Sequence, residues 1–424
     1  MLSGHIRVNG RSYHCGYRPT LQLKNVSAEP SILELRAPRQ GDALLGPGML
    51  ALLLFSIGHF AIDMYSGAIG AFQPLLVDKL GLTLTQAGLL GGVMVFSGSF
   101  VQPAYGFLSD RFHSRMFSVL APAMAGIFIS LLGLSWNFGS AAVLVFLGGV
   151  GIASFHPQAS AWATLGISSN RGKWMAVFIS AGTLGLAIGP TYFASVFQWV
   201  GSERSYLAAI PGVIVTVVLI AYLRQPAHLA GAPRGRIDFA ALRAVRKPLV
   251  ILHLLVVLRS AVQIVFGQLL PLYLHRERGF SLIEAASALT MFQVAGAAGG
   301  FAGGHFADKF GGRRVILLSM IGCVPFLALF FFGHGPASMI GLALSGLILL
   351  FTIPVNVVMA QDLAPGQAGT VSSLMMGFAW GIAGMIFIPL IGFLSDRFSM
   401  QTTMSALTVF PLIGFFLTLA LPKK

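Results

Sequence analysis

Four ionisable side chains stand within long apolar stretches of the sequence, where a charged group is costly to bury. His59 and Asp63 are four residues apart, so both project from one face of a helix. His156 precedes Pro157 in a second apolar stretch, and Arg259 lies in a third. Ionisable groups at membrane depth are rare and tend to mark transport or relay sites, so we take these four as the candidate site.

Together these residues could couple a proton to a solute. Burial favours a neutral carboxyl and a nearby arginine favours a charged one, so movement between wet and closed surroundings would switch the protonation of Asp63. We predict Asp63 and His59 as the proton-coupling residues, and Arg259, always charged, as a ligand of an anionic substrate group or the counter-charge of Asp63. A structural ion pair, with histidines that only link helices, stays open. The other predicted substrate contacts are His156, Gln158 and Gln263.

The composition indicates which elements carry these residues. Of the 424 residues, 56% are hydrophobic and only 9% are charged, whereas a soluble domain has roughly 25% charged residues. The apolar stretches reach the ~20 residues of helix that span a bilayer. A barrel would require alternating polarity, which is absent, so the spans must be helices. The sequence predicts an all-α membrane protein with no enzymatic module.

Twelve spans are predicted, in two pseudo-symmetric six-helix bundles. With the N-terminus inside, the predicted cytoplasmic segments carry 21 of the 27 Lys and Arg residues and the outer loops five, which supports this count and cytoplasmic termini. The spans lie near 48–78, 83–108, 114–135, 139–165, 172–198, 203–224, 248–275, 281–307, 314–332, 337–361, 368–393 and 402–421.

The chain is predicted to have four parts: a tail (1–45), a first bundle (46–224), a linker (225–247) and a second bundle (248–424). The tail is polar; a cytoplasmic segment and an over-extended gene start both remain open. The linker is Pro-, Gly- and Arg-rich and then amphipathic, which favours a short helix on the anionic leaflet over an unstructured linker. The net charge of +14 is spread over the loops, so nucleic-acid binding is not expected. The two cysteines indicate neither a disulfide nor a metal site.

Two loops repeat a charged motif at equivalent places in the halves. The first contains Gly106, Asp110 and Arg111, and the second contains Gly304, Asp308, Lys309, Arg313 and Arg314. The glycines allow close helix packing, and the carboxylate could hold a basic group and a helix N-terminus of the neighbouring bundle. The second loop resembles the signature of the major facilitator superfamily at almost every position. Polar turns with a topological charge are the alternative.

Two further motifs concern gating and direction. Asp396 and Arg397 follow Gly392 in an echo of the same loop at the predicted outer side, where they form a candidate outer gate or an incidental turn. Span five contains Gly185, Gly189 and Pro190, a run that resembles the antiporter motif of drug-exporting facilitators. Its glycines allow close packing and its proline bends the helix.

The region from about 48 to 420 resembles the fosmidomycin resistance protein family of major facilitator transporters. The resemblance rests on the His59 and Asp63 pair, the His156-Pro157 pair, the Gly-Pro of span five and the basic position Arg259, and is strongest from Ala360 onward, with Gln361 and Asp362. Gln158, where an acidic residue is expected, and Ala161, where a basic one is expected, depart from the pattern, and the arginine of span four found in many drug antiporters is missing.

The resemblance implies a proton-coupled exporter of fosmidomycin or similar compounds in the bacterial inner membrane. Fosmidomycin is a phosphonate, which suits a site with Arg259 and histidines. We expect a monomer in contact with membrane lipid, a small-molecule substrate and protons, without a cofactor or a metal. Uptake of an organic anion or sugar by proton or cation symport is the alternative. No catalytic triad or phosphate-binding loop supports a membrane enzyme.

Overall fold

The computed structural model describes residues 7–8, 11–12, 47–112, 114–165, 167, 171–224 and 239–422. The chain divides into two units, Met1–Leu44 and Leu45–Lys424. In the first unit, β1 (Arg7–Val8) pairs with β2 (Arg11–Ser12) as an antiparallel hairpin. Most of the predicted tail and residues 225–238 of the predicted linker lie outside the described residues, so the roles given to these segments stay predictions.

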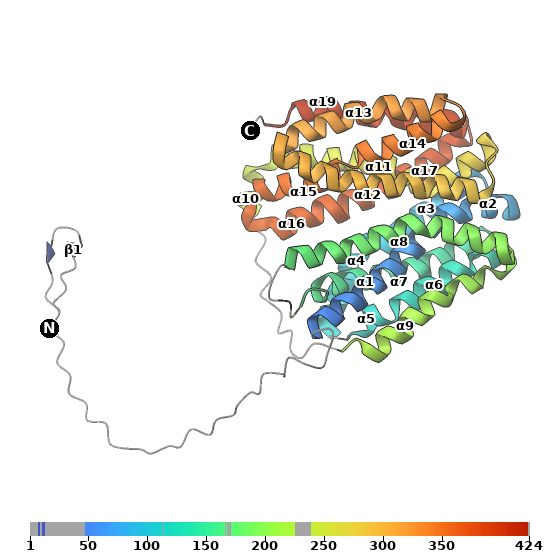
Figure 1. Ribbon diagram of the computed structural model, residues 1–424, viewed down its shortest axis with the longest axis horizontal. Helices are drawn as coiled ribbons and strands as arrows, with labels where there is room; N and C mark the ends of the chain where they lie inside the picture. Colours follow the sequence, from blue (N-terminus) through green and yellow to red (C-terminus); the bar gives the residue numbers. More distant parts are fainter. Residues whose placement is uncertain are drawn as a thin grey trace, which may run out of the picture. The chain divides into compact units, whose positions relative to one another are not determined.

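The second unit is built of helices (Figure 1). Its first half contains α1 (Pro47–Ser66), α2 (Ala68–Leu80), α3 (Leu84–Val95), η1 (Phe96–Phe100), α4 (Gln102–Phe112), α5 (Met116–Val119), α6 (Ala121–Ser130), η2 (Leu131–Leu134), α7 (Phe138–Trp162), α8 (Arg171–Val200), η3 (Ser202–Ala209) and α9 (Ile210–Tyr222).

A short helix, α10 (Phe239–Ala244), lies within the predicted linker and leads to the second half. That half contains α11 (Arg246–Arg278), α12 (Leu282–Phe310), α13 (Gly312–Phe332), α14 (Gly335–Leu349), α15 (Thr352–Leu363), η4 (Pro365–Gln367), α16 (Ala368–Ser373), η5 (Leu374–Phe378), α17 (Ala379–Ser395), α18 (Met400–Ser405), η6 (Ala406–Thr408) and α19 (Val409–Leu419).

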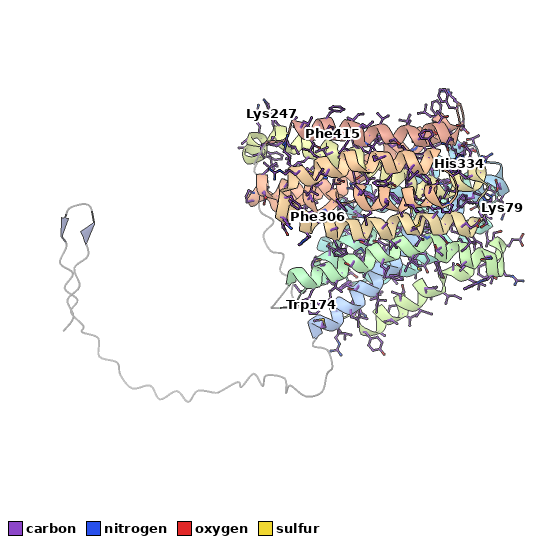
Figure 2. All side chains as sticks on the ribbon, turned by 45° about the horizontal axis from the view of Figure 1, so that its top comes forward. Lys79, Trp174, Lys247, Phe306, His334 and Phe415 are labelled. Atoms are coloured by element: carbon purple, nitrogen blue, oxygen red, sulfur yellow. The ribbon has the colours of Figure 1, made fainter. Side chains whose placement is uncertain are left out.

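Among the described residues, twelve helical stretches are long and apolar enough to cross a membrane. Each begins and ends within three residues of the predicted span, so the predicted all-α fold with twelve membrane helices is confirmed. Figure 2 shows Lys79 and His334 near one end of the unit and Trp174 and Lys247 near the opposite end. We refer to these as the predicted outer end and the predicted cytoplasmic end.

Helix starts at the predicted outer end follow local sequence rules. Thr83, Asn137 and Ser281 cap α3, α7 and α12, and each forms a reciprocal capping box with the residue three positions later. For α12 this partner is Glu284, which accepts hydrogen bonds from the Ser281 N–H and hydroxyl at 2.9 and 2.7 Å. Glu284 is therefore a helix-start residue.

Three helix pairs make the most extensive contacts between the two halves: α2 with α11, α3 with α17, and α8 with α12. Small residues make these contacts possible, since a Cβ added at Gly88 would lie 2.7 Å from the carbonyl oxygen of Ile388. Polar links join the third pair, because the hydroxyls of Thr191 and Thr290 are 2.7 Å apart and Gln293 donates to the Leu186 carbonyl at 3.2 Å. The halves are thus joined by close contact between helix backbones at small residues and by side-chain hydrogen bonds.

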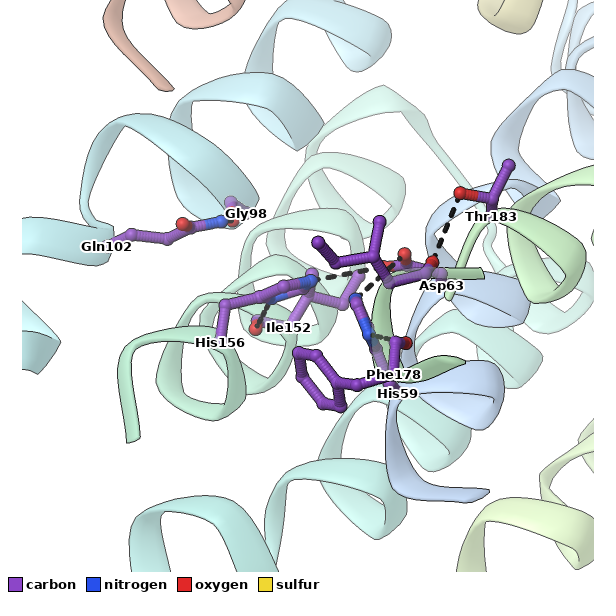
Figure 3. A network of polar contacts seen from close by, with 9 residues as sticks. His59, Asp63, Gly98, Gln102, Ile152, His156, Phe178 and Thr183 are labelled. Carbon is purple, nitrogen blue, oxygen red and sulfur yellow. Dashed lines mark hydrogen bonds and ion pairs between the residues drawn. The ribbon is translucent and has the colours of Figure 1, made fainter. Parts of the chain in front are cut away.

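Two facing spans contain a wider helical turn. η1 and η5 are both π-helical, and they contact each other across the halves. In η1 the Val101 N–H bonds the Phe96 carbonyl at 3.2 Å, five residues back, and the Gln102 side chain donates to the Gly98 carbonyl at 2.8 Å (Figure 3). Pro103, which follows, has no N–H to donate to the helix. Such turns are common where a helix serves a functional site.

Candidate functional site

The candidate site is assembled from α1 and α7 in the first half. His59 and Asp63 lie one turn apart on α1, near the middle of a span that runs from Gly48 to Leu80. His156 reaches them from α7. The two helices approach closely at Gly58, which has no side chain; a Cβ added there would lie 2.8 Å from the Phe155 ring. At the break between α1 and α2, the backbone N–H of Gly67 donates a hydrogen bond to the main-chain carbonyl oxygen of Asp63 at 2.9 Å.

The three side chains form a single cluster, which we call the His–Asp–His cluster (His59, Asp63 and His156; Figure 3). The Nε2 atom of His59 lies 3.3 Å from Asp63 Oδ2, and the Nε2 atom of His156 lies 3.2 Å from Asp63 Oδ1. Each carboxylate oxygen therefore faces one imidazole. The side chains of His59, Asp63 and His156 are 9%, 19% and 23% exposed, so the cluster is largely buried.

Backbone carbonyls fix the tautomers of both histidines. His59 Nδ1 lies 2.8 Å from the Phe178 carbonyl oxygen, and His156 Nδ1 lies 2.9 Å from the Ile152 carbonyl oxygen. A carbonyl oxygen only accepts hydrogen bonds, so we assign a proton to each Nδ1. In a neutral imidazole each Nε2 then presents a lone pair to the carboxylate. These two contacts become attractive only when a proton stands between nitrogen and oxygen, so the cluster has a place for one proton at each Nε2.

α8 forms the wall beside the cluster. The Phe178 ring stacks on His59 with 4.3 Å between centroids and 27° between planes. One turn further on, a Cβ added at Gly182 would lie 2.6 Å from Asp63 Oδ2. No side chain larger than hydrogen fits there without moving the cluster.

The predicted antiporter-like run continues this wall. Gly185 lies against the Phe60 backbone and Gly189 against the Met64 backbone, both at distances that exclude a Cβ. Pro190 approaches Gly67 at the break in span one, where an added Cβ would be 3.3 Å from its ring. The run therefore joins α8 to α1 within the first half.

The cluster also has the donor set of a metal site. One donor atom from each residue lies within 4.8 Å of the others, and two imidazoles with a carboxylate are typical ligands of zinc. No metal was expected from the sequence. Because protons and a divalent cation would occupy the same atoms, transport measurements on this protein require a chelator control.

Arg259 lies apart from the cluster, on α11 in the second half. Its side chain is 5% exposed and donates from Nη1 to Gln263 Oε1 at 2.5 Å. Its guanidinium carbon lies 5.9 Å from the centre of the Trp380 ring on α17. The possible Asp63–Arg259 pair is not formed, because Asp63 is held by histidines of its own half. Within the described part of the chain, Arg259 has no carboxylate partner.

Gln158 differs from its prediction as a substrate contact. Its Oε1 accepts from the N–H and the hydroxyl of Ser118 at 3.2 and 2.6 Å, and its Nε2 donates to the Ser114 carbonyl at 3.0 Å. The side chain is 3% exposed. Its amide thus holds α7 to the start of span three.

The first charged loop begins at the end of α4. Gly106 packs near Pro157, 3.4 Å from an added Cβ, and Arg111 is exposed in the last turn. The side chain of Asp110 lies outside the described residues.

The second charged loop joins α12 to α13. A Cβ added at Gly304 would lie 3.8 Å from the Pro354 ring. The Lys309 Nζ atom lies 5.4 Å from the centre of the Phe310 ring. Arg313 donates to the Leu419 carbonyl at 3.0 Å within its own half. A pocket of about 840 Å³ at this end contains the remaining charged residues of the region: Asp308, Arg314 and Asp362. The neighbouring Gln361 donates to the Ser372 hydroxyl at 2.8 Å and so joins α15 to α16.

Asp396 links the two halves at the predicted outer end. It accepts hydrogen bonds from the N–H of Leu84 at 2.8 Å, and from the N–H and hydroxyl of Thr85 at 2.7 and 2.5 Å. A carboxylate from α17 thereby caps the N-terminus of α3, a favourable place for negative charge. Partial burial raises the pKa of Asp396, but these hydrogen bonds outweigh it and hold the pKa below its ordinary value. Arg397 lies over the Phe393 ring at 3.9 Å.

Three residues that shape the sites, Phe178, Gly182 and Trp380, are not among the predicted site residues. Phe178 and Gly182 are four residues apart and so share the face of α8 that meets α1. That spacing was a signal in the sequence, but which helix they meet depends on the tertiary fold. Trp380 is one of several aromatic residues in apolar spans, and nothing in its spacing distinguishes it.

Comparison with known proteins gives consistent results. A family model described as Major Facilitator Superfamily matches residues 55–387. The chain is 29% identical to the uncharacterized MFS-type transporter YfnC of Bacillus subtilis, covering 90% of this chain and 96% of that protein. It is 27% identical to the fosmidomycin resistance protein of Escherichia coli, covering 87% of this chain and 92% of that protein.

A similar fold is found in a solved structure of a bacterial homolog of the human lysosomal transporter Spinster, in an inward-facing and unoccupied conformation. The TM-score is 0.76 at 15% sequence identity, covering 89% of this chain and 97% of that one. This likeness concerns the fold alone.

Proposed function

Because this chain belongs to the Major Facilitator Superfamily, we propose that it is a proton-coupled antiporter that exports small organic or drug-like solutes such as fosmidomycin. The observation that carries this proposal is the His–Asp–His cluster, in which both Nδ1 atoms are committed to carbonyl oxygens and both Nε2 atoms face one carboxylate. The 27% identical fosmidomycin resistance protein supports export. We place the protein in the bacterial inner membrane with both termini cytoplasmic.

In this mechanism, protonation changes how tightly α7 is held to α1. With protons at Nε2, each imidazolium donates to the Asp63 carboxylate and draws His156 of α7 toward α1. After the protons leave, lone pairs face the carboxylate and the contact becomes repulsive. A proton can therefore bias the packing of the first half, which is the differential interaction that alternating access requires.

Transport into inside-out membrane vesicles tests this function. We expect fosmidomycin to accumulate in vesicles whose interior is acidic, and the accumulation to collapse when a protonophore removes the gradient. Vesicles without the protein and vesicles treated with a chelator are the controls. Solute and proton moving in the same direction would instead establish the alternative, uptake by symport. Transport that ignores the proton gradient would remove proton coupling from the proposal.

The Asp396 contact is proposed to act as an outer latch between α17 and α3, and it yields a prediction. The Asp396→Asn variant loses the charge at the α3 N-terminus, an effect of about 1 kcal/mol, or roughly a 5-fold population shift. Because Asp396 has a lowered pKa, the latch is intact above the ordinary pKa of an aspartate and weakens as the pH falls through the lowered value. Acid should thus reproduce the variant.

Pulsed electron paramagnetic resonance can measure this shift. Spin labels are placed on Arg204→Cys and His334→Cys, both exposed at the predicted outer end, after the two native cysteines are replaced. Asp396→Asn should populate longer distances at neutral pH. Asp308→Asn, the same change in the related motif at the opposite end, is the control. An unchanged distance distribution in Asp396→Asn would show that the contact is an incidental turn.

A further inference from the structure

Arg259 is a buried cation that has no counter-charge among the described residues. It is only 5% exposed to solvent, and no carboxylate in the described residues pairs with it. The Trp380 ring offers a weak cation–π contact at 5.9 Å, and Gln263 offers one neutral acceptor. An isolated buried charge is strongly unfavourable unless it is paired. A residue of this kind is retained at a cost in stability, which indicates a partner that arrives from outside the chain.

The hydrogen bonds of Arg259 show which edge of the guanidinium is free. Nη1 is occupied by Gln263, whereas Nε is buried and has no hydrogen-bond partner in the part of the chain that the structure describes. The Nε–Nη2 edge presents two parallel N–H donors, which is the geometry that two oxygens of a carboxylate, phosphonate or sulfonate accept. A single carbonyl or hydroxyl would leave one of the two donors unsatisfied.

We propose that the Nε–Nη2 edge of Arg259 binds an oxyanionic group of the transported solute, which makes this protein a transporter of small organic anions. This inference rests on the proposed function and names its substrate class. Gln263 holds the guanidinium in position through Nη1, and Trp380 covers one side of it. The His–Asp–His cluster and the anion site then lie on different halves, α1 with α7 and α11 with α17, and no ion pair between described residues joins them.

Binding to purified protein tests the assignment separately from transport. Fosmidomycin, phosphonoacetate and methylphosphonate are titrated by calorimetry against the wild type, and each is compared with its neutral ester, in which every phosphonate and carboxylate group is esterified. We expect the wild type to bind at least one anion, and to prefer it to its neutral ester. Arg259→Gln should weaken anion binding about 100-fold, as expected for a charge-assisted bidentate pair. Arg259→Lys, which keeps the charge and loses the fork, should lie between the two.

The matched control is Arg276→Gln, the same change on the same helix at an exposed position, which should bind like the wild type. Removing an uncompensated buried charge should also raise the melting temperature of the empty Arg259→Gln protein, whereas a merely structural arginine would give a decrease. Repeating the titration with inorganic phosphate, and in nanodiscs with and without anionic lipid, tells a solute site from a lipid headgroup site. Competition by anionic lipid alone would overturn the assignment.

Equal binding of anions by the wild type and Arg259→Gln, or no binding of any anion in the panel, would also overturn it. The proposed function would survive either result if the vesicles still exported a neutral solute against a proton gradient. If anions bind through Arg259 while transport ignores the proton gradient, the substrate class stands and the coupling fails.

Discussion

The Asp63→Asn variant should lose transport driven by a proton gradient while it still exchanges solute across the membrane. Asparagine has the shape of aspartate, and its amide can still contact both imidazoles, so the packing of α1 against α7 should persist. What is lost is the negative charge that attracts a proton to each Nε2 atom. Each charge-assisted hydrogen bond contributes about 1.5–3 kcal/mol, and 1.4 kcal/mol is a tenfold change, so we expect gradient-driven transport to fall about 100-fold.

Two measurements in the same vesicles separate coupling from folding. Accumulation against a pH gradient reports coupling, and exchange of labelled for unlabelled fosmidomycin reports binding and movement. Asp78→Asn is the matched control, because Asp78 lies in the same span and its side chain is 59% exposed. Its Oδ2 atom lies 3.5 Å from His275 Nε2, and this contact does not involve the cluster. Gradient-driven accumulation at the wild-type level in Asp63→Asn would remove Asp63 from the mechanism. Loss of both activities would instead indicate that the variant cannot change conformation.

The helices could be predicted from the sequence because their signal is local. A bilayer requires about 20 apolar residues per helix, and the loop charges fix how many times the chain crosses. The position of His59 relative to Asp63 is equally local, since four residues make one helical turn. For these features the structure adds only the ends of the helices.

The cluster itself could not be derived in this way. His156 is 93 positions away from Asp63, and only the packing of α7 on α1 brings the two side chains together. The same limit explains Gln158, because His156, two residues earlier, faces α1 while Gln158 faces the start of span three. Residues two positions apart on a helix point about 200° apart, so a role assigned to one does not extend to the other. Arg259 was a candidate by burial alone, but its missing counter-charge is a property of the fold.

Substitution of Gly182 is expected to have the second large effect on gradient-driven transport, because this residue determines how closely α8 approaches the cluster. A Cβ at this position would lie 2.6 Å from Asp63 Oδ2, well below ordinary contact distance. The Cβ would lie closer still to His59 Nε2, so Gly182→Ala must move α8, the His59 imidazole or the carboxylate. Movement of the carboxylate would disturb both imidazole contacts, so we expect gradient-driven transport to fall at least about 10-fold. Overpacking of this kind also costs about 1–3 kcal/mol of stability.

Two further glycine variants show whether this effect belongs to the cluster. Gly185→Ala strains the same α1–α8 interface against the Phe60 backbone, one turn from the cluster, so it should lower stability and leave the dependence of transport on the proton gradient intact. Gly300→Ala, whose added Cβ would meet only the Leu350 carbonyl at 3.9 Å, should behave like the wild type. If Gly182→Ala and Gly185→Ala lost stability and coupling in the same proportion, tight packing of α8 would explain both. A loss of coupling confined to Gly182→Ala would show that the position of α8 depends on the protonation of the cluster through direct contact at Gly182.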